Sequence, residues 1–94
     1  MAITAESTAE ETVDPVAVVY PNPTKDLVTI NIKNATQLST DIQIIDAYGK
    51  MYRAVGKKLS DVTLQVDLSR YSSGIYFIRV LVDNEYKIYR VMKM

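Results

Sequence analysis

The side chains that most often perform covalent chemistry in proteins are absent from this chain. Its 94 residues include no histidine and no cysteine. Ser-His and Cys-His nucleophilic catalysis is therefore excluded, as is a zinc site built from imidazole or thiolate ligands. Ser72 and Ser73 precede Gly74, but they form no GxSxG turn of the kind that exposes a hydrolase serine. A Ser–Lys pair would require a buried lysine with a lowered pKa.

Acidic residues are the remaining candidates for chemistry, and they are dispersed. The seven aspartates include Asp26, Asp46, Asp67 and Asp83, which lie in separate predicted turns. Calcium loops instead concentrate carboxylates at alternate positions around a glycine, whereas aspartates beside turns usually accept hydrogen bonds from nearby backbone amides. With three glycines in the chain, a glycine-rich phosphate loop is also excluded. We therefore expect no enzyme activity, no metal site and no cofactor.

Charge is balanced overall but not along the chain. Eleven basic residues match eleven acidic ones, which argues against a nucleic-acid partner, because such binding needs a basic surplus. The first fourteen residues carry four acids and no base, while the last ten carry Lys87, Arg90 and Lys93 against Glu85. No apolar run is long enough to span a membrane. No signal-peptide pattern opens the chain, and for an exported protein we expect that signal to lie outside these residues.

Composition divides the chain into two parts. Residues 1–15 are mostly Ala, Thr, Ser and Glu up to Pro15, with no repeating apolar face. Such a segment buries too little apolar surface to offset the entropy of ordering its backbone, so we predict a flexible linker. Residues 16–94 are rich in β-branched and aromatic residues, which favour strands. The length supports one domain.

Alternating apolar residues and regularly spaced turn signals predict an all-β domain. The segment from Pro21 to Thr24 forces a turn, since two prolines remove two backbone donors. Gly49 can adopt the positive φ that a short hairpin requires. Seven short strands in a chain of this size indicate an antiparallel β-sandwich. They are predicted at residues 16–20, 27–33, 40–46, 51–56, 63–68, 75–82 and 86–92.

The strand at residues 75–82 is unusual because both of its faces are apolar. Such a strand is either covered by a loop or presents its outer face to a partner, and the covered interpretation is favoured because core explanations usually win. One face carries Tyr76, Ile78, Val80 and Val82, and the other carries Ile75, Phe77 and Leu81.

Three stretches in order resemble the C-terminal sorting domains that direct cargo proteins through the bacterial type IX secretion system. The first is Tyr20-Pro21-Asn22-Pro23, which is similar to the YPNP opening of that family. The second runs from Asp46 to Lys50 with Gly49 and is similar to its D-x-x-G-K hairpin. The third, residues 67–80 with Gly74 and Tyr76, resembles its DLS…GIYFxRV block. Together with the lysine-containing last strand, the resemblance covers residues 19–94.

The resemblance implies an immunoglobulin-like sandwich at the C-terminus of a secreted cargo protein, with the cargo domain on its N-terminal side. It implies recognition by a translocon at the outer membrane of a Gram-negative bacterium, after transit through the periplasm and before arrival at the cell surface. It further implies that a sortase-like cysteine protease cuts in or beside the segment from Ala2 to Asp14. That enzyme would then join the cargo to an anionic lipopolysaccharide.

The last strand is the predicted translocon-docking element, acting by charge and strand addition. A solvated strand face explains its basic residues equally well. The other motif residues have structural interpretations: Pro21 and Pro23 shape the entry to the second strand, Gly49 and Gly74 give backbone freedom, and Tyr76 ties loops through its hydroxyl. The predicted docking residues are Lys87, Tyr89, Arg90, Val91, Met92, Lys93 and Met94.

Other functions stay open for this sequence. Within the same family, it could be an adaptor of the export machinery that handles anionic lipopolysaccharide. A carbohydrate-binding module would instead use exposed tyrosines as a stacking platform, with Tyr48, Tyr52, Tyr71 and Tyr89 as the candidates. A spacer or adhesion domain would pair through its edge strands, which would allow a homodimer.

Overall fold

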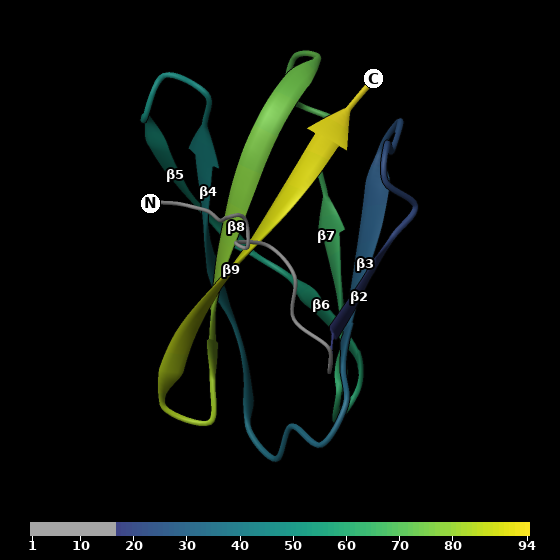
Figure 1. Cartoon of the computed structure of the whole chain (residues 1–94), viewed down its shortest axis with the longest axis vertical. Coiled ribbons are helices and arrows are strands. Elements are labelled where there is room, and N and C mark those ends of the chain that lie inside the picture. Colours follow the sequence, from purple (N-terminus) through teal and green to yellow (C-terminus); the bar gives the residue numbers. More distant parts are fainter. Residues whose placement is uncertain (1–16) are drawn as a thin grey trace, which may run out of the picture.

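A computed structural model describes residues 17–94 of the chain (Figure 1). The predicted linker, residues 1–15, lies outside the described residues, and so does Val16, the first residue of the first predicted strand. The boundary between linker and domain therefore stays a prediction.

The described residues form strands and connecting turns without any helix, so the predicted all-β class is confirmed. Residues 17–94 accordingly offer no helix that is long and apolar enough to cross a membrane. The strands are β2 (Ala17–Tyr20), β3 (Leu27–Ile32), β4 (Leu38–Asp46), β5 (Met51–Val55), β6 (Lys57–Ser60), β7 (Thr63–Asp67), β8 (Gly74–Val82) and β9 (Glu85–Lys93).

The strands form two four-stranded antiparallel sheets that enclose one core, as a β-sandwich does. One sheet has the order β2-β3-β7-β6, and the other has the order β5-β4-β8-β9. Figure 1 shows β9 beside β8, at the margin of its sheet. The inward residues of both sheets meet in a single apolar cluster, which includes Ile30 and Leu64 from one sheet and Ile44 and Ile78 from the other. Full burial of one such side chain contributes about 1.5–3 kcal/mol.

The structure has eight strands between residues 17 and 94, where the sequence predicted seven. The additional strand is β6, whose four residues are all exposed. Its sequence Lys-Lys-Leu-Ser has neither alternation nor β-branched residues, and it becomes a strand because Lys57 and Lys58 pair with Gln65 and Leu64 of β7. Long-range pairing, rather than local preference, therefore produces this strand.

Gly56 marks the point where the chain crosses from one sheet to the other, between β5 and β6. Its backbone N–H donates a hydrogen bond of 2.7 Å to the carbonyl of Thr40. A Cβ atom at this position would lie 2.8 Å from Leu64 Cδ1 and 2.9 Å from its Cγ. Because Leu64 is fully buried, only glycine fits here without a shift of the core.

Candidate docking surface

The last strand, β9, has one face in the core and one face in solvent. It pairs with β8 along its whole length, from Glu85 opposite Val82 to Lys93 opposite Gly74. Tyr89 and Val91 point into the core and are 3% and 0% exposed. The predicted docking residues are therefore divided: these two side chains hold the strand in the fold, and a docking partner would meet those on the other face.

Three apolar side chains on the outer face of β9 are exposed: Tyr86 by 58%, Ile88 by 49% and Met92 by 39%. The basic residues of the strand differ in setting. Arg90 is exposed on this outer face, whereas Lys87 and Lys93 are half-buried on the inward side. Lys87 Nζ lies 3.8 Å from Glu85 Oε1, a surface ion pair that contributes little.

The segment at residues 21–24, here called the PNP loop, fastens to the outer edge of β9. The Asn22 amide donates to the carbonyl of Arg90 at 3.1 Å and accepts from the backbone N–H of Met92 at 2.9 Å. The Thr24 N–H donates to the Met92 carbonyl at 2.9 Å, and the Met94 N–H donates to the Thr24 carbonyl at 2.8 Å. The peptide bonds before Pro21 and Pro23 are both cis.

The PNP loop therefore links the two sheets. It follows β2, which belongs to one sheet, and it bonds to β9, which belongs to the other. Thr24, which is 2% exposed, also bonds through its hydroxyl to the carbonyl of Leu27. The motif that the sequence identified as an entry to the second strand has this additional role in closing the sandwich.

The PNP loop occupies only part of the β9 edge. Its contacts involve the outward backbone groups of Arg90, Met92 and Met94, so the residues with outward backbone groups are the even-numbered ones. By the same alternation, Tyr86 and Ile88 direct their N–H and C=O groups outward, and β9 is the end strand of its sheet in the described part of the chain. This stretch is a strand edge to which another strand could add.

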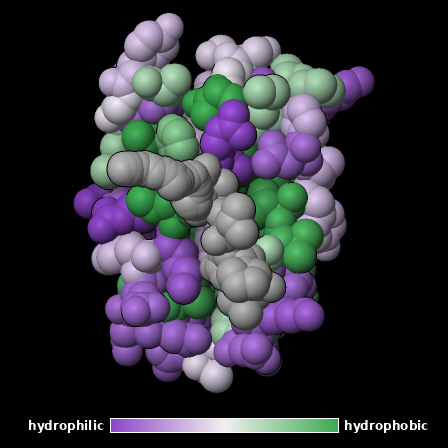
Figure 2. Space-filling model, in the orientation of Figure 1, coloured by the Kyte–Doolittle hydropathy of each residue, from purple (hydrophilic) through white to green (hydrophobic). Residues whose placement is uncertain are grey.

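The outer face of the β5-β4-β8-β9 sheet continues the apolar surface of β9. Ile75, Phe77 and Leu81 of β8 lie on this face and are half-buried. Met51 and Val55 of β5 are exposed. Within residues 17–94, the outer face of β8 is therefore only partly covered, so the interpretation of β8 as a covered strand holds only in part. Figure 2 shows apolar residues near the middle of the visible surface and mostly hydrophilic residues at its lower end.

The remaining motif residues stabilise turns. Asp46 accepts hydrogen bonds from the N–H groups of Tyr48 and Lys50, each at 2.9 Å, and Gly49 has a φ of +88°, as the hairpin motif predicted. The Tyr76 hydroxyl donates to the carbonyl of Ser72 at 2.7 Å. That bond ties one loop, just before β8, to the buried ring of Tyr76.

The tyrosine platform proposed for carbohydrate binding does not form. Tyr89 is buried in the core, while Tyr48 stands at a hairpin tip and is 96% exposed. Tyr52 and Tyr71 pack edge to face with ring centroids 5.4 Å apart, and Tyr71 contacts Tyr76 at 5.7 Å. The alternation of β9 directs Tyr89 inward, so these four rings cannot present one flat surface.

Asp83 holds the turn that positions the start of β9. Its carboxylate accepts hydrogen bonds from the Thr36 hydroxyl at 2.6 Å and from the Gln37 N–H at 2.7 Å. These bonds favour the charged form and lower the pKa of Asp83 below 3.8. In the folded state the group thus binds its proton at lower pH than in the unfolded state.

We expect the domain to lose stability as pH falls below about 3.8 toward the lowered pKa of Asp83, because the unfolded chain then binds more protons. The contribution is fully present above that value. Asp83→Asn should reduce the acid dependence of the melting temperature between pH 5 and pH 2.5, leaving the part due to Asp67, whose pKa is also lowered by hydrogen bonds from Ser69. A variant whose melting temperature followed the wild-type acid profile would contradict this role for Asp83.

A comparison with known families gives a match over most of the chain. The model of the family described as "Secretion system C-terminal sorting domain" matches residues 18–94. This range contains all three motif stretches and every residue of the described strands except Ala17, the first residue of β2. No individual curated protein matches the chain.

Proposed function

Because the chain belongs to the family of type IX secretion C-terminal sorting domains, we propose that residues 16–94 form the folded signal that carries an N-terminal cargo domain across the outer membrane. Domains of this family act as secretion signals and not as catalytic domains. Recognition by the secretion machinery and export to the cell surface or beyond follow from membership. The family match to residues 18–94 is the observation on which this proposal depends most.

The proposed mode of recognition is docking of the translocon on β9 and the adjoining outer face of its sheet. The open edge at Tyr86 and Ile88 supports strand addition, and the exposed side chains of Ile88, Arg90 and Met92 support side-chain contacts. Met94 offers further contact at the chain end, beyond the half-buried Lys93. Tyr89 and Val91 would contribute indirectly, by fixing the strand in the core.

Processing belongs to the same proposal. A sortase-like cysteine protease cuts the linker in or beside residues 2–14 and joins the released cargo to an anionic lipopolysaccharide at the cell surface. The small and acidic residues of this segment suit an accessible protease substrate. The immunoglobulin-like type of the sandwich stays a prediction from the family resemblance.

The test is a fusion of residues 16–94 to the C-terminus of a reporter whose signal peptide takes it only as far as the periplasm. The fusion is expressed in a bacterium that has a type IX system. We expect the reporter to appear at the cell surface or in the medium. The matched controls are the reporter without the domain and the same fusion in a strain that lacks the translocon. A folded fusion that stayed in the periplasm of the competent strain would refute the signal function.

A further inference from the structure

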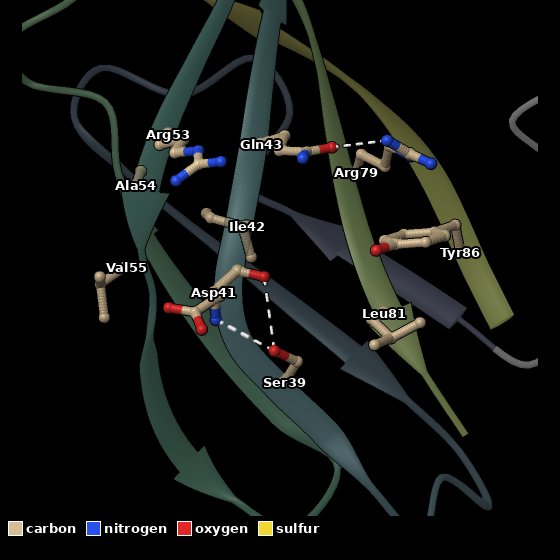
Figure 3. A pocket seen from close by; sticks show the side chains of 10 residues that line it. All are labelled: Ser39, Asp41, Ile42, Gln43, Arg53, Ala54, Val55, Arg79, Leu81 and Tyr86. Carbon is tan, nitrogen blue, oxygen red and sulfur yellow. Dashed lines mark hydrogen bonds between the residues drawn. The ribbon is translucent and has the colours of Figure 1, made fainter. Parts of the chain in front are cut away.

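A groove of about 550 Å³ crosses the outer face of the β5-β4-β8-β9 sheet (Figure 3). All four strands contribute to its lining. Its lining includes the charged, polar and apolar side chains of Asp41, Gln43, Arg53, Arg79, Leu81 and Tyr86. Arg53, Gln43, Arg79 and Tyr86 belong neither to the buried core nor to the turn motifs, so packing and turn formation do not account for their grouping in this groove.

An irregularity in β4 lies at one end of the groove. Leu38 pairs with Val82 and Ile42 pairs with Val80, so residues 39–41 of β4 lie opposite the single residue Leu81 of β8. Extra residues in one strand bend it and redirect the side chains beside the bulge. The outer surface of the sheet is therefore hollowed next to Asp41, where a regular sheet would be flat.

Two arginines flank Gln43 in one row across the sheet, since Gln43 pairs with Arg53 of β5 and with Arg79 of β8. Arg79 Nη1 donates to Gln43 Oε1 at 2.7 Å, and its guanidinium carbon lies 3.8 Å from the centre of the Tyr86 ring. Figure 3 shows Arg53, Gln43 and Arg79 side by side, with Tyr86 beneath Arg79. The hydrogen bond and the ring hold Arg79 in one orientation while most of its N–H donors stay available.

Neither arginine has an acidic partner within residues 17–94, where the single ion pair joins Lys87 and Glu85. Arg90 adds a third positive charge to the same outer face, and Asp41 is the acid among the groove-lining residues. An anionic ligand would therefore meet a complementary charge at the arginine end of the groove. Asp41 at the other end would repel a second acid and accept hydrogen bonds instead.

We propose that this groove receives an acidic segment of a partner protein, with one carboxylate held between Arg53 and Arg79. The inference rests on the proposed signal function, and it specifies the chemistry of the partner segment that recognises the domain. The planar guanidinium matches a carboxylate through two parallel hydrogen bonds. Leu81, Val55 and Tyr86 would pack against apolar neighbours of that carboxylate, and arginine and tyrosine are the residues enriched at the centres of protein interfaces.

The first test measures export of the reporter fusion carrying Arg53→Gln and Arg79→Gln together. We expect the exported fraction to fall by roughly tenfold or more, which corresponds to a loss of about 1.4 kcal/mol in docking. The matched control is Lys57→Gln with Lys58→Gln, two exposed charges on β6 of the opposite sheet. Export of the double arginine variant at the wild-type level would overturn the proposal, whereas failure of the wild-type fusion would refute the signal function itself.

The second test identifies the occupant, with a photo-crosslinking amino acid in place of Val55, a groove residue that is 76% exposed. During export we expect a cross-link to a protein segment that contains Asp or Glu beside apolar residues, and loss of that cross-link in the double arginine variant. The control places the cross-linker at Lys58 of β6. A cross-link to a glycan or nucleic acid, to an acid-free segment, or one that survives loss of both arginines would overturn the proposal.

Discussion

Deletion of residues 89–94 is expected to unfold the domain and not merely to remove a docking strand. The deletion removes Tyr89 and Val91, which are 3% and 0% exposed in the core. Loss of a large buried side chain typically costs about 2–5 kcal/mol. The whole stability of a domain is usually about 5–15 kcal/mol, and a domain this small buries proportionately less surface.

The same deletion abolishes the contacts of the PNP loop. Asn22 bonds to Arg90 and Met92, and Thr24 bonds to Met92 and Met94, so each of these hydrogen bonds loses its partner. The first half of β8 would then lie at the edge of its sheet, because Tyr76 and Ile78, both buried, lose their partners Val91 and Tyr89 on β9. We therefore expect no cooperative thermal transition from the truncated chain.

Circular dichroism and a thermal melt of purified protein measure this effect directly. The control shortens the chain by Met94 alone, which removes one bond to Thr24 and no buried side chain, and should keep the transition. A cooperative melt after deletion of residues 89–94 would show that β9 is dispensable for folding. A loss of export after that deletion is therefore no proof of docking, because an unfolded signal would fail for a different reason.

Local sequence pattern was sufficient to predict most of the sandwich. Strands such as β3 and β7 were predicted from their alternation of apolar and polar residues, and their apolar residues Val28, Ile30, Leu64 and Val66 are buried. Gly49 was identified from the turn chemistry of its hairpin, and it has a positive φ. In these places local preference and tertiary packing agree.

Features that depend on distant pairing were not predictable from local pattern. β6 exists because β7 pairs with it, and its own residues carry no strand signal. Asn22 contacts a backbone group 70 residues away, so nothing near the YPNP motif indicated that it closes the sandwich. The groove depends on a bulge in β4, and the sequence around Ser39 gives no sign of extra residues there.

The candidate docking residues were predicted as one continuous strand, and the structure separates them by face. Alternation along the predicted strand could not assign Tyr89 and Val91 to the core, because the other face carries the apolar residues Tyr86, Ile88 and Met92. Arg53 and Arg79 were not identified, since they lie on two strands far apart in the sequence and meet only through Gln43. Register, which sequence alone leaves open, created that row.

A proline at Ile88 is expected to block export while leaving the domain folded. The even-numbered residues of β9 direct their backbone groups away from β8, so proline here removes an outward donor and no bond within the sheet. Proline is tolerated on edge strands for this reason, and natural proteins use it there to prevent strand addition.

If a translocon strand adds to the open stretch at Tyr86 and Ile88, the Ile88→Pro fusion should lose roughly tenfold or more of its exported fraction, the effect of about 1.4 kcal/mol. Ile88→Gln is the matched control, because it removes the same apolar side chain, 49% exposed, and keeps the N–H. Equal losses in the two variants would assign recognition to the side chain of Ile88. A folded proline variant that was exported normally would exclude strand addition at this edge. The arginine groove would then be the surface to test, because binding to its side chains requires no new backbone pairing.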